Sequence, residues 1–312
     1  MRGSALKLTR RGWIFAVTLA PLAAQQPVSE GGAAAAANSA PPQPAGPLDW
    51  VCPMDRDVRS DKPGVCSRCG MKLVFGVQDE EEYPFDLKIQ PPIFRAGQKV
   101  QLQFRVSDPK TGKPINKFEI VHDKLFHLFI VSQDLQYFIH DHPVPQKDGA
   151  FFFDETFPKP GLYRVVGDFY PTGGTPQLTA RTVIVPGAPG QEVPFIQPKL
   201  KPEIGVSKGE NTEVELTMDP PEPVVGLKTL LFLKFKQSEG LEQYLSAWAH
   251  MLCASDDLID AIHDHPFIAD GGPQMQFNII FPRARTYRIW IQFQRKGVVN
   301  TVSWTIPVSE LK

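Results

Sequence analysis

The sequence predicts a mainly β protein, in which a small Cys-rich module precedes two tandem antiparallel β-sandwich domains. Apolar and polar residues alternate over short segments, for example at Val100, Leu102, Phe104 and Val106, and this period of two is typical of half-buried strands. The chain has 31 prolines and 24 glycines, which separate such segments. Short strands at this spacing, without a sustained helical period, favour sandwiches.

The second observation is an internal repeat. The segment from His127 to Pro143 reads H-L-F-I-V-S-Q-D-L-Q-Y-F-I-H-D-H-P, and that from His250 to Pro266 reads H-M-L-C-A-S-D-D-L-I-D-A-I-H-D-H-P. Matching positions lie 123 residues apart, and the offset becomes 124 after a one-residue insertion. We therefore expect repeat 1 over residues 80–187 and repeat 2 over residues 200–312. Both weakly resemble the immunoglobulin-like or cupredoxin-like sandwiches of exported metal-handling proteins.

Local signals add detail to the repeats. The dipeptides Asp148-Gly149 and Asp270-Gly271 occupy nearly matching positions and predict hairpin turns. Apolar residues at helical spacing over residues 241–248 predict one short helix in repeat 2.

The N-terminal residues indicate export. Four basic residues precede the apolar run Trp13–Ala20, a pattern typical of a signal peptide, which we place at residues 1–24. The pair Arg10-Arg11 also resembles a twin-arginine signal, so that the Sec and twin-arginine routes both stay open. Residues 25–47 read as a disordered linker rich in Ala and Pro. We expect a periplasmic or extracellular protein without a membrane span.

Charge and motifs exclude several functions. The formal net charge is −1 and no basic stripe is present, which argues against nucleic acid as a partner. The sequence lacks a phosphate-binding Gly loop, a G-x-S-x-G motif and an H-E-x-x-H motif. Three histidines with an open coordination position can activate water. No separate acid or base stands out at a readable spacing, and we therefore do not expect an enzyme.

The Cys module, residues 48–76, gathers soft metal ligands. Cys66 and Cys69 have the spacing that lets two thiolates hold one ion, and an earlier loop supplies Cys52 and Met54. Thiolates and thioethers favour copper(I), with zinc as the alternative. A second interpretation stays open, in which two of the cysteines form a disulfide in an exported protein.

Residues 50–74 resemble the heavy-metal-binding domain found beside copper and other metal efflux proteins. The family's pattern is a Cys-Pro-Met-His opening, a D-K-P-G turn and a Cys-Pro-x-Cys-Gly-Met close. The resemblance implies that Met71 belongs to the site, and we expect Gly64 to give the turn a conformation closed to other residues. Asp55 and Ser67 depart from the pattern, and the first departure removes a nitrogen ligand.

The histidines predict a second class of site. If a two-residue turn follows Ser132, His127 lies directly opposite His140 and His142 points to the same face. The equivalent group in repeat 2 is His250, His263 and His265. Three imidazoles are suited to copper(II) or zinc, and we expect binding to fail below about pH 6, because ligating imidazoles are neutral and their ordinary pKa is about 6.5.

Alternatives stay open for these histidines. His-Asp-His-Pro at the end of a strand also serves as a structural corner without metal. We expect His122 to add a ligand in repeat 1 only, and Cys253 to be a buried apolar residue.

The combined ligands predict an extracytoplasmic copper-binding protein for sequestration, sensing or delivery. Its expected partners are the metal ion and a metal-efflux or other envelope protein. The alternative function is a structural or adhesive sandwich protein that binds a partner protein and holds metal only in its Cys module.

Overall fold

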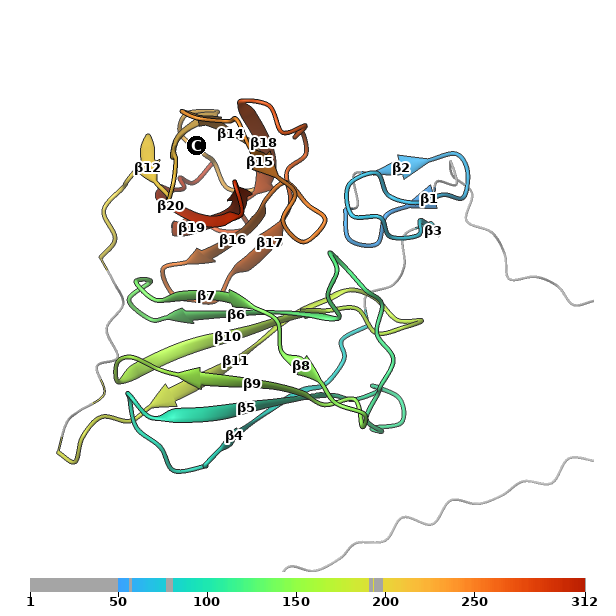
Figure 1. Cartoon of the computed structure of the whole chain (residues 1–312), viewed down its shortest axis with the longest axis vertical. Helices are drawn as coiled ribbons and strands as arrows, with labels where there is room; N and C mark the ends of the chain where they lie inside the picture. Colours follow the sequence, from blue (N-terminus) through green and yellow to red (C-terminus); the bar gives the residue numbers. More distant parts are fainter. Residues whose placement is uncertain (1–49, 56–57, 77–80, 191–192, 194–198, 312) are drawn as a thin grey trace, which may run out of the picture. The chain divides into compact units, whose positions relative to one another are not determined.

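The computed structural model describes residues 50–55, 58–76, 81–190, 193 and 199–311 (Figure 1). The expected signal peptide, residues 1–24, and the expected linker, residues 25–47, lie outside these residues. All regular elements of the described residues are strands, which confirms the mainly β fold class. None of the described residues belongs to a helix long and apolar enough to cross a membrane.

The Cys module contains a small antiparallel sheet. Its strands are β1 (Trp50–Val51), β2 (Arg59–Ser60) and β3 (Val74–Phe75), in the order β2-β1-β3. The short central strand β1 delivers the chain directly to Cys52, which is fully buried beside Cys66 and Leu73. The module's core is therefore built around its own thiols.

Repeat 1 consists of two four-stranded antiparallel sheets around an apolar core rich in Phe. One sheet has the order β4-β5-β9-β8, with β4 (Phe85–Gln90), β5 (Lys99–Val106), β8 (Val144–Pro145) and β9 (Phe151–Thr156). The other has the order β11-β10-β6-β7, with β6 (Phe126–Ser132), β7 (Phe138–Asp141), β10 (Gly161–Phe169) and β11 (Gln177–Val185).

Repeat 2 has the same two-sheet plan. One sheet has the order β12-β13-β14-β18, with β12 (Val206–Lys208), β13 (Glu213–Asp219), β14 (Lys228–Phe235) and β18 (Gln274–Ile280). The other contains β15 (Leu241–Glu242), β16 (His250–Ser255), β17 (Ala261–Asp264), β19 (Thr286–Arg295) and β20 (Val298–Pro307). Two tandem antiparallel sandwiches are thus confirmed.

The helix predicted over residues 241–248 is wrong. Leu241 begins strand β15, and residues 244–247 form a tight turn closed by backbone hydrogen bonds in both directions. Leu241 is buried and Trp248 packs against the core of repeat 2 from the strand and the turn. The two apolar residues lie on either side of the turn, and their spacing in the sequence happens to match that of a helix. Asp148-Gly149 lies in the turn between the paired strands β8 and β9, which confirms this hairpin turn. Asp270-Gly271 lies in a longer loop between the bridge partners Ile268 and Gln276.

The predicted register of the histidine hairpins is also wrong, by two residues. His140 lies opposite Phe129 rather than His127, and His263 lies opposite Leu252. The hydrogen bond from the N–H of Ser132 to the carbonyl oxygen of Tyr137 encloses four residues, where two had been predicted.

The error leaves the faces unchanged. Side chains alternate with a period of two along a strand, so that a shift of two residues keeps every side chain on its side. The new register places His142 directly across from His127 and His140 diagonally from it. The three histidines of repeat 1 therefore still converge.

The two repeats meet through an apolar cluster of equivalent positions. Each residue that β6, its following turn and β10 contribute has its counterpart 123 or 124 positions later in repeat 2. The interface therefore has approximate two-fold symmetry, like the self-complementary interface of a homodimer. The residues are Phe129, Val131, Leu135 and Val166 in repeat 1 and Leu252, Ala254, Leu258 and Trp290 in repeat 2.

Candidate metal centres

The chain brings the module's three cysteines together with two tight backbone connections. The N–H of Gly70 bonds the carbonyl oxygen of Cys66 at 2.9 Å, and the N–H of Cys66 bonds that of Met71 at 2.7 Å. This turn requires a left-handed conformation at Gly70, where φ is 73°. Gly64 in the D-K-P-G segment is not among the residues with positive φ, so the special conformation expected there is wrong.

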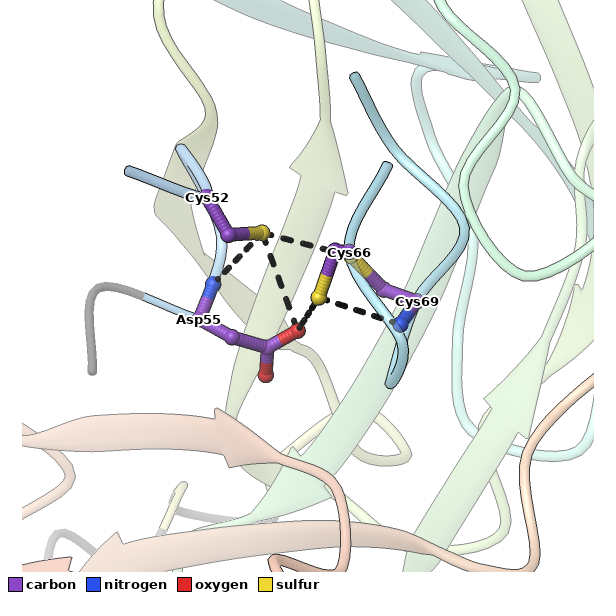
Figure 2. Close-up of side chains that lie close together, drawn as sticks. All are labelled: Cys52, Asp55, Cys66 and Cys69. Atoms are coloured by element: carbon purple, nitrogen blue, oxygen red, sulfur yellow. Dashed lines mark hydrogen bonds between the residues drawn. The ribbon is translucent and has the colours of Figure 1, made fainter. Parts of the chain in front are cut away.

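Figure 2 shows Cys52, Cys66 and Cys69 facing Asp55. The Sγ atoms of Cys52 and Cys69 lie 3.4 Å apart, and Asp55 Oδ2 lies 3.3 Å from the Sγ of Cys66. The four ligand atoms all lie within 4.8 Å of one another. Tetrahedral zinc–sulfur bonds of about 2.3 Å place sulfurs about 3.8 Å apart, so the group fits one tetrahedral ion.

Asp55 stands where the heavy-metal-binding family has a histidine, and its carboxylate lies at the thiols. Its carboxylate accepts a hydrogen bond from Arg68 Nη1 at 3.0 Å through one oxygen, and its other oxygen faces the thiols. All three thiols are free, and the separation of Cys52 and Cys69 far exceeds a disulfide bond of about 2.05 Å. Met54 and Met71 pack in apolar clusters that include Cys69.

The first histidine group contains the predicted set from repeat 1. His127 Nε2 donates to the carbonyl oxygen of Val121 at 3.0 Å, so its Nδ1 carries a lone pair. His140 Nδ1 donates to Gln292 Oε1 of repeat 2 at 2.9 Å, so its Nε2 also carries a lone pair. The two nitrogens, His127 Nδ1 and His140 Nε2, lie 3.3 Å apart, and His142 Nε2 lies 3.2 Å from His127 Nδ1.

The second group differs from the predicted one. His250 Nε2 donates to the carbonyl oxygen of Tyr244 at 2.9 Å, and its Nδ1 lies 3.0 Å from His265 Nε2. The third member is His122 of repeat 1, not His263. The expectation that His122 adds a ligand to the group of repeat 1 is therefore wrong.

His263 is bound elsewhere. Its Nδ1 makes a short hydrogen bond with the carboxylate of Asp168 in repeat 1, and both side chains are buried. Asp168 and Gln292, which were not predicted, are equivalent positions of the two repeats, and each bonds a histidine of the opposite repeat. Comparing the repeats at these positions shows Asp in one and Gln in the other. Cys253 lies in the core of repeat 2, which confirms that it is a buried apolar residue.

Both repeats match one family over residues 77–187 and 207–310. The chain belongs to that family, described as Domain of unknown function (DUF8832). Residues 50–74 match a second family, the heavy metal binding domain, which confirms the resemblance seen in the sequence. The DUF8832 repeats thus follow a heavy metal binding domain in this chain.

Three solved structures are similar to the chain at low identity. The adhesin InvE of Yersinia pseudotuberculosis has 10% identity and a TM-score of 0.23, over 71% of this chain and 58% of that one. The Escherichia coli adhesin FdeC has 11% and 0.25, over 77% and 70%. Two fibronectin type III domains of chicken tenascin have 9% and 0.21, over 72% and 99%. No curated protein matches the chain.

Burial keeps six histidines of the DUF8832 repeats neutral. It lowers the pKa of His122 and of His127 to about 4 and that of His142 to about 3. The pKa values of His140, His250 and His265 also fall well below the ordinary value, first because of burial and then because of neighbouring imidazoles. Neutral imidazole is the form that ligates metal.

The thiols share charge unequally. Hydrogen bonds from Cys52 and Cys69 lower the pKa of Cys66, and backbone N–H groups of Arg68 and Cys69 also point to its sulfur. The hydrogen bond with Cys66 raises the pKa of Cys52 to about 12. One thiolate with two protonated neighbours is a state that a cation would change, since ligation requires thiolates.

A third group connects the module to repeat 2. Asp55, Asp264 and His265 offer ligand atoms within 4.8 Å of one another, and burial raises the pKa of Asp264 to about 7. His265 therefore belongs to both this group and the second histidine group.

Proposed function

We propose that the protein is an extracytoplasmic copper-binding protein that sequesters, senses or delivers the metal and is not an enzyme. The observation that carries the proposal is the convergence of three thiols and one carboxylate inside a heavy metal binding domain. Sulfur-rich sites favour copper(I) among the available ions, with zinc as the alternative. The basic and apolar N-terminal sequence supports export.

The first histidine group supports a second class of site. His127 Nδ1 and His140 Nε2 point lone pairs at each other across 3.3 Å, because their other nitrogens donate to oxygens. Two facing acceptors repel each other unless a cation or a donor lies between them. Nitrogen ligands favour copper(II) or zinc, so the protein would hold both oxidation states of copper at separate sites. A metal-efflux or other envelope protein is the partner that this role requires.

The test is copper(I) titration of the full chain against a chromophoric chelator under reducing conditions. Replacing Cys66 and Cys69 together by Ser should abolish tight binding, whereas Cys253→Ala, which removes the buried thiol outside the module, should leave it unchanged. An unchanged affinity in the double variant would refute the assignment.

The histidines separate this function from a purely adhesive one. In a full chain with Cys52, Cys66 and Cys69 changed to Ser, copper(II) uptake that His140→Ala and His142→Ala reduce supports two site classes. Absence of copper(II) uptake would confine metal to the Cys module and favour a structural or adhesive role for the sandwiches.

A further inference from the structure

Two equivalent turns meet where the repeats face each other. Residues 121–124 and 244–247 each close by backbone hydrogen bonds between their first and last residues. Asp123 of the first turn accepts a hydrogen bond from Ser246 Oγ of the second at 2.7 Å. Asp123 and Ser246 are themselves equivalent positions, 123 residues apart. The turns therefore lie on the approximate two-fold axis.

The second residue of the turn is His122 in repeat 1 and Leu245 in repeat 2. Both have left-handed backbones, with φ of 47° and 52°. This conformation is unfavourable for residues other than glycine. It carries the side chain of His122 across to repeat 2, where its ring centroid lies 3.8 Å from that of His265 and 5.2 Å from that of His250.

His122 has one uncompensated feature. The residue is only 2% exposed, and neither ring nitrogen has a hydrogen bond of good geometry among the described residues, although the Leu245 backbone is close enough to affect its pKa. Buried polar groups are normally paired, and an exception needs an explanation. A bound cation would explain the unpaired ring, whereas the left-handed backbone belongs to the turn itself, since Leu245 shares it.

We propose that His122, His250 and His265 form a zinc or copper(II) site whose ligands come from both repeats, so that the bound ion clamps the repeats together. The inference deepens the proposed function and rests on it for the identity of the metal, but it does not depend on the Cys module.

The contacts of His250 and His265 fit such a site. His250 Nε2 donates to the Tyr244 carbonyl oxygen, which leaves Nδ1 as the ligand atom and fixes the ring. That atom lies 3.0 Å from His265 Nε2. Tetrahedral zinc–nitrogen bonds of about 2.0–2.1 Å require ligand nitrogens about 3.3 Å apart, so small movements would admit the ion.

The two histidine groups differ in their third imidazole. In repeat 1 it is His140, whose Nδ1 donates to the Gln292 amide oxygen. The equivalent residue, His263, bonds the carboxylate of Asp168 through its Nδ1, and its buried Nε2 has no hydrogen-bond partner among the described residues. His263 is not part of the second group, in which His122 supplies the third nitrogen.

The experiment uses the full chain with Cys52, Cys66 and Cys69 changed to Ser, titrated with Zn²⁺ alone by calorimetry and by metal analysis after dialysis. The parent should bind one ion at each histidine group. His122→Leu, which copies the turn of repeat 2, should weaken one of the two sites by about 100-fold or more. Asp123→Asn, a matched change in the same turn that retains the acceptor, should leave both sites intact.

Two further readouts complete the test. Zn²⁺ should raise the thermal unfolding midpoint of the whole chain less in His122→Leu than in Asp123→Asn, because only the latter keeps the clamp. If His122→Leu does not fold, the imidazole nitrogen resonances of His122 in the parent decide, since ligation must shift them on addition of Zn²⁺.

The inference is overturned if His122→Leu keeps both sites at unchanged affinity, or if the His122 resonances do not respond to Zn²⁺. It is equally overturned if the parent without thiols binds no zinc. In the last case copper(I) binding by the intact Cys module would still hold, so that the two proposals fail separately.

Discussion

Asp55→Asn should stabilise the metal-free Cys module at neutral pH while weakening its metal binding. Burial raises the pKa of Asp55 to about 6 from an ordinary 3.8, despite the opposing charge of Arg68. The folded state therefore binds a proton more tightly than the unfolded state does. Between about pH 4 and pH 6 stability falls as pH rises, and above pH 6 the full cost of the buried carboxylate is present.

The size of the effect follows from the pKa. One pKa unit corresponds to about 1.4 kcal/mol, so a rise from 3.8 to about 6 costs about 3 kcal/mol at pH 7. Asn removes this charge and keeps an oxygen that can accept from Arg68. The pKa of about 6 already includes the attraction of Arg68, so the hydrogen bond to Arg68 is not subtracted a second time. We expect a gain of up to about 3 kcal/mol for the metal-free protein at pH 7 and no gain at pH 4.

The assay is amide hydrogen exchange of the module in the full, metal-free chain at pH 7 and pH 4, with zinc affinity measured in parallel. Ser67→Ala, an exposed change in the same loop, is the control. A variant that opens more readily than the parent at pH 7 would show that the Arg68 ion pair outweighs burial, and the reasoning would fail.

Two other predictions concern backbone and pH. Gly70→Val should weaken metal binding by about tenfold, because a left-handed residue with a side chain costs about 1–2 kcal/mol. Gly64→Ala, whose new Cβ would lie 3.9 Å from Leu73 Cδ1, should bind like the parent, as chelator competition of both variants will show. Copper(II) uptake by the histidines of the chain without module thiols should persist at pH 5.5 and fail near pH 4, because burial lowers the pKa of His122 and His127 to about 4. Failure already at pH 6 in a d–d absorption titration would contradict this reasoning.

The sequence was sufficient for the features that depend on periodicity. Alternation predicted the strands, and the offset of 123 predicted two sandwiches. It also placed three histidines of repeat 1 together although the loop after Ser132 was misjudged, because a shift of two residues does not change the face. A shift of one residue would have moved His127 away from its partners. The sequence therefore predicts which face of a strand a side chain lies on more securely than which residue lies opposite it.

Features that depend on contact between the repeats were beyond this reasoning. Nothing within repeat 1 indicates that His122 turns toward repeat 2, or that Asp168 engages His263. Similarly, comparison with the pattern of the metal-binding family indicates that Asp55 removes a nitrogen ligand. Its carboxylate nevertheless faces the thiols and offers an oxygen in the place of that nitrogen.

Duplication within one chain explains how such differences arise. In a symmetric homodimer a substitution changes both sites at once, because each residue occurs twice. In this chain the residues of an equivalent pair can differ, as His122 and Leu245 do, and Asp168 and Gln292. One histidine group can therefore keep ligands from its own repeat while the other recruits its third imidazole across the interface. The covalent link between the repeats allows the two related groups to differ, and only the proposed site that contains His122 would take its metal ligands from both sandwiches.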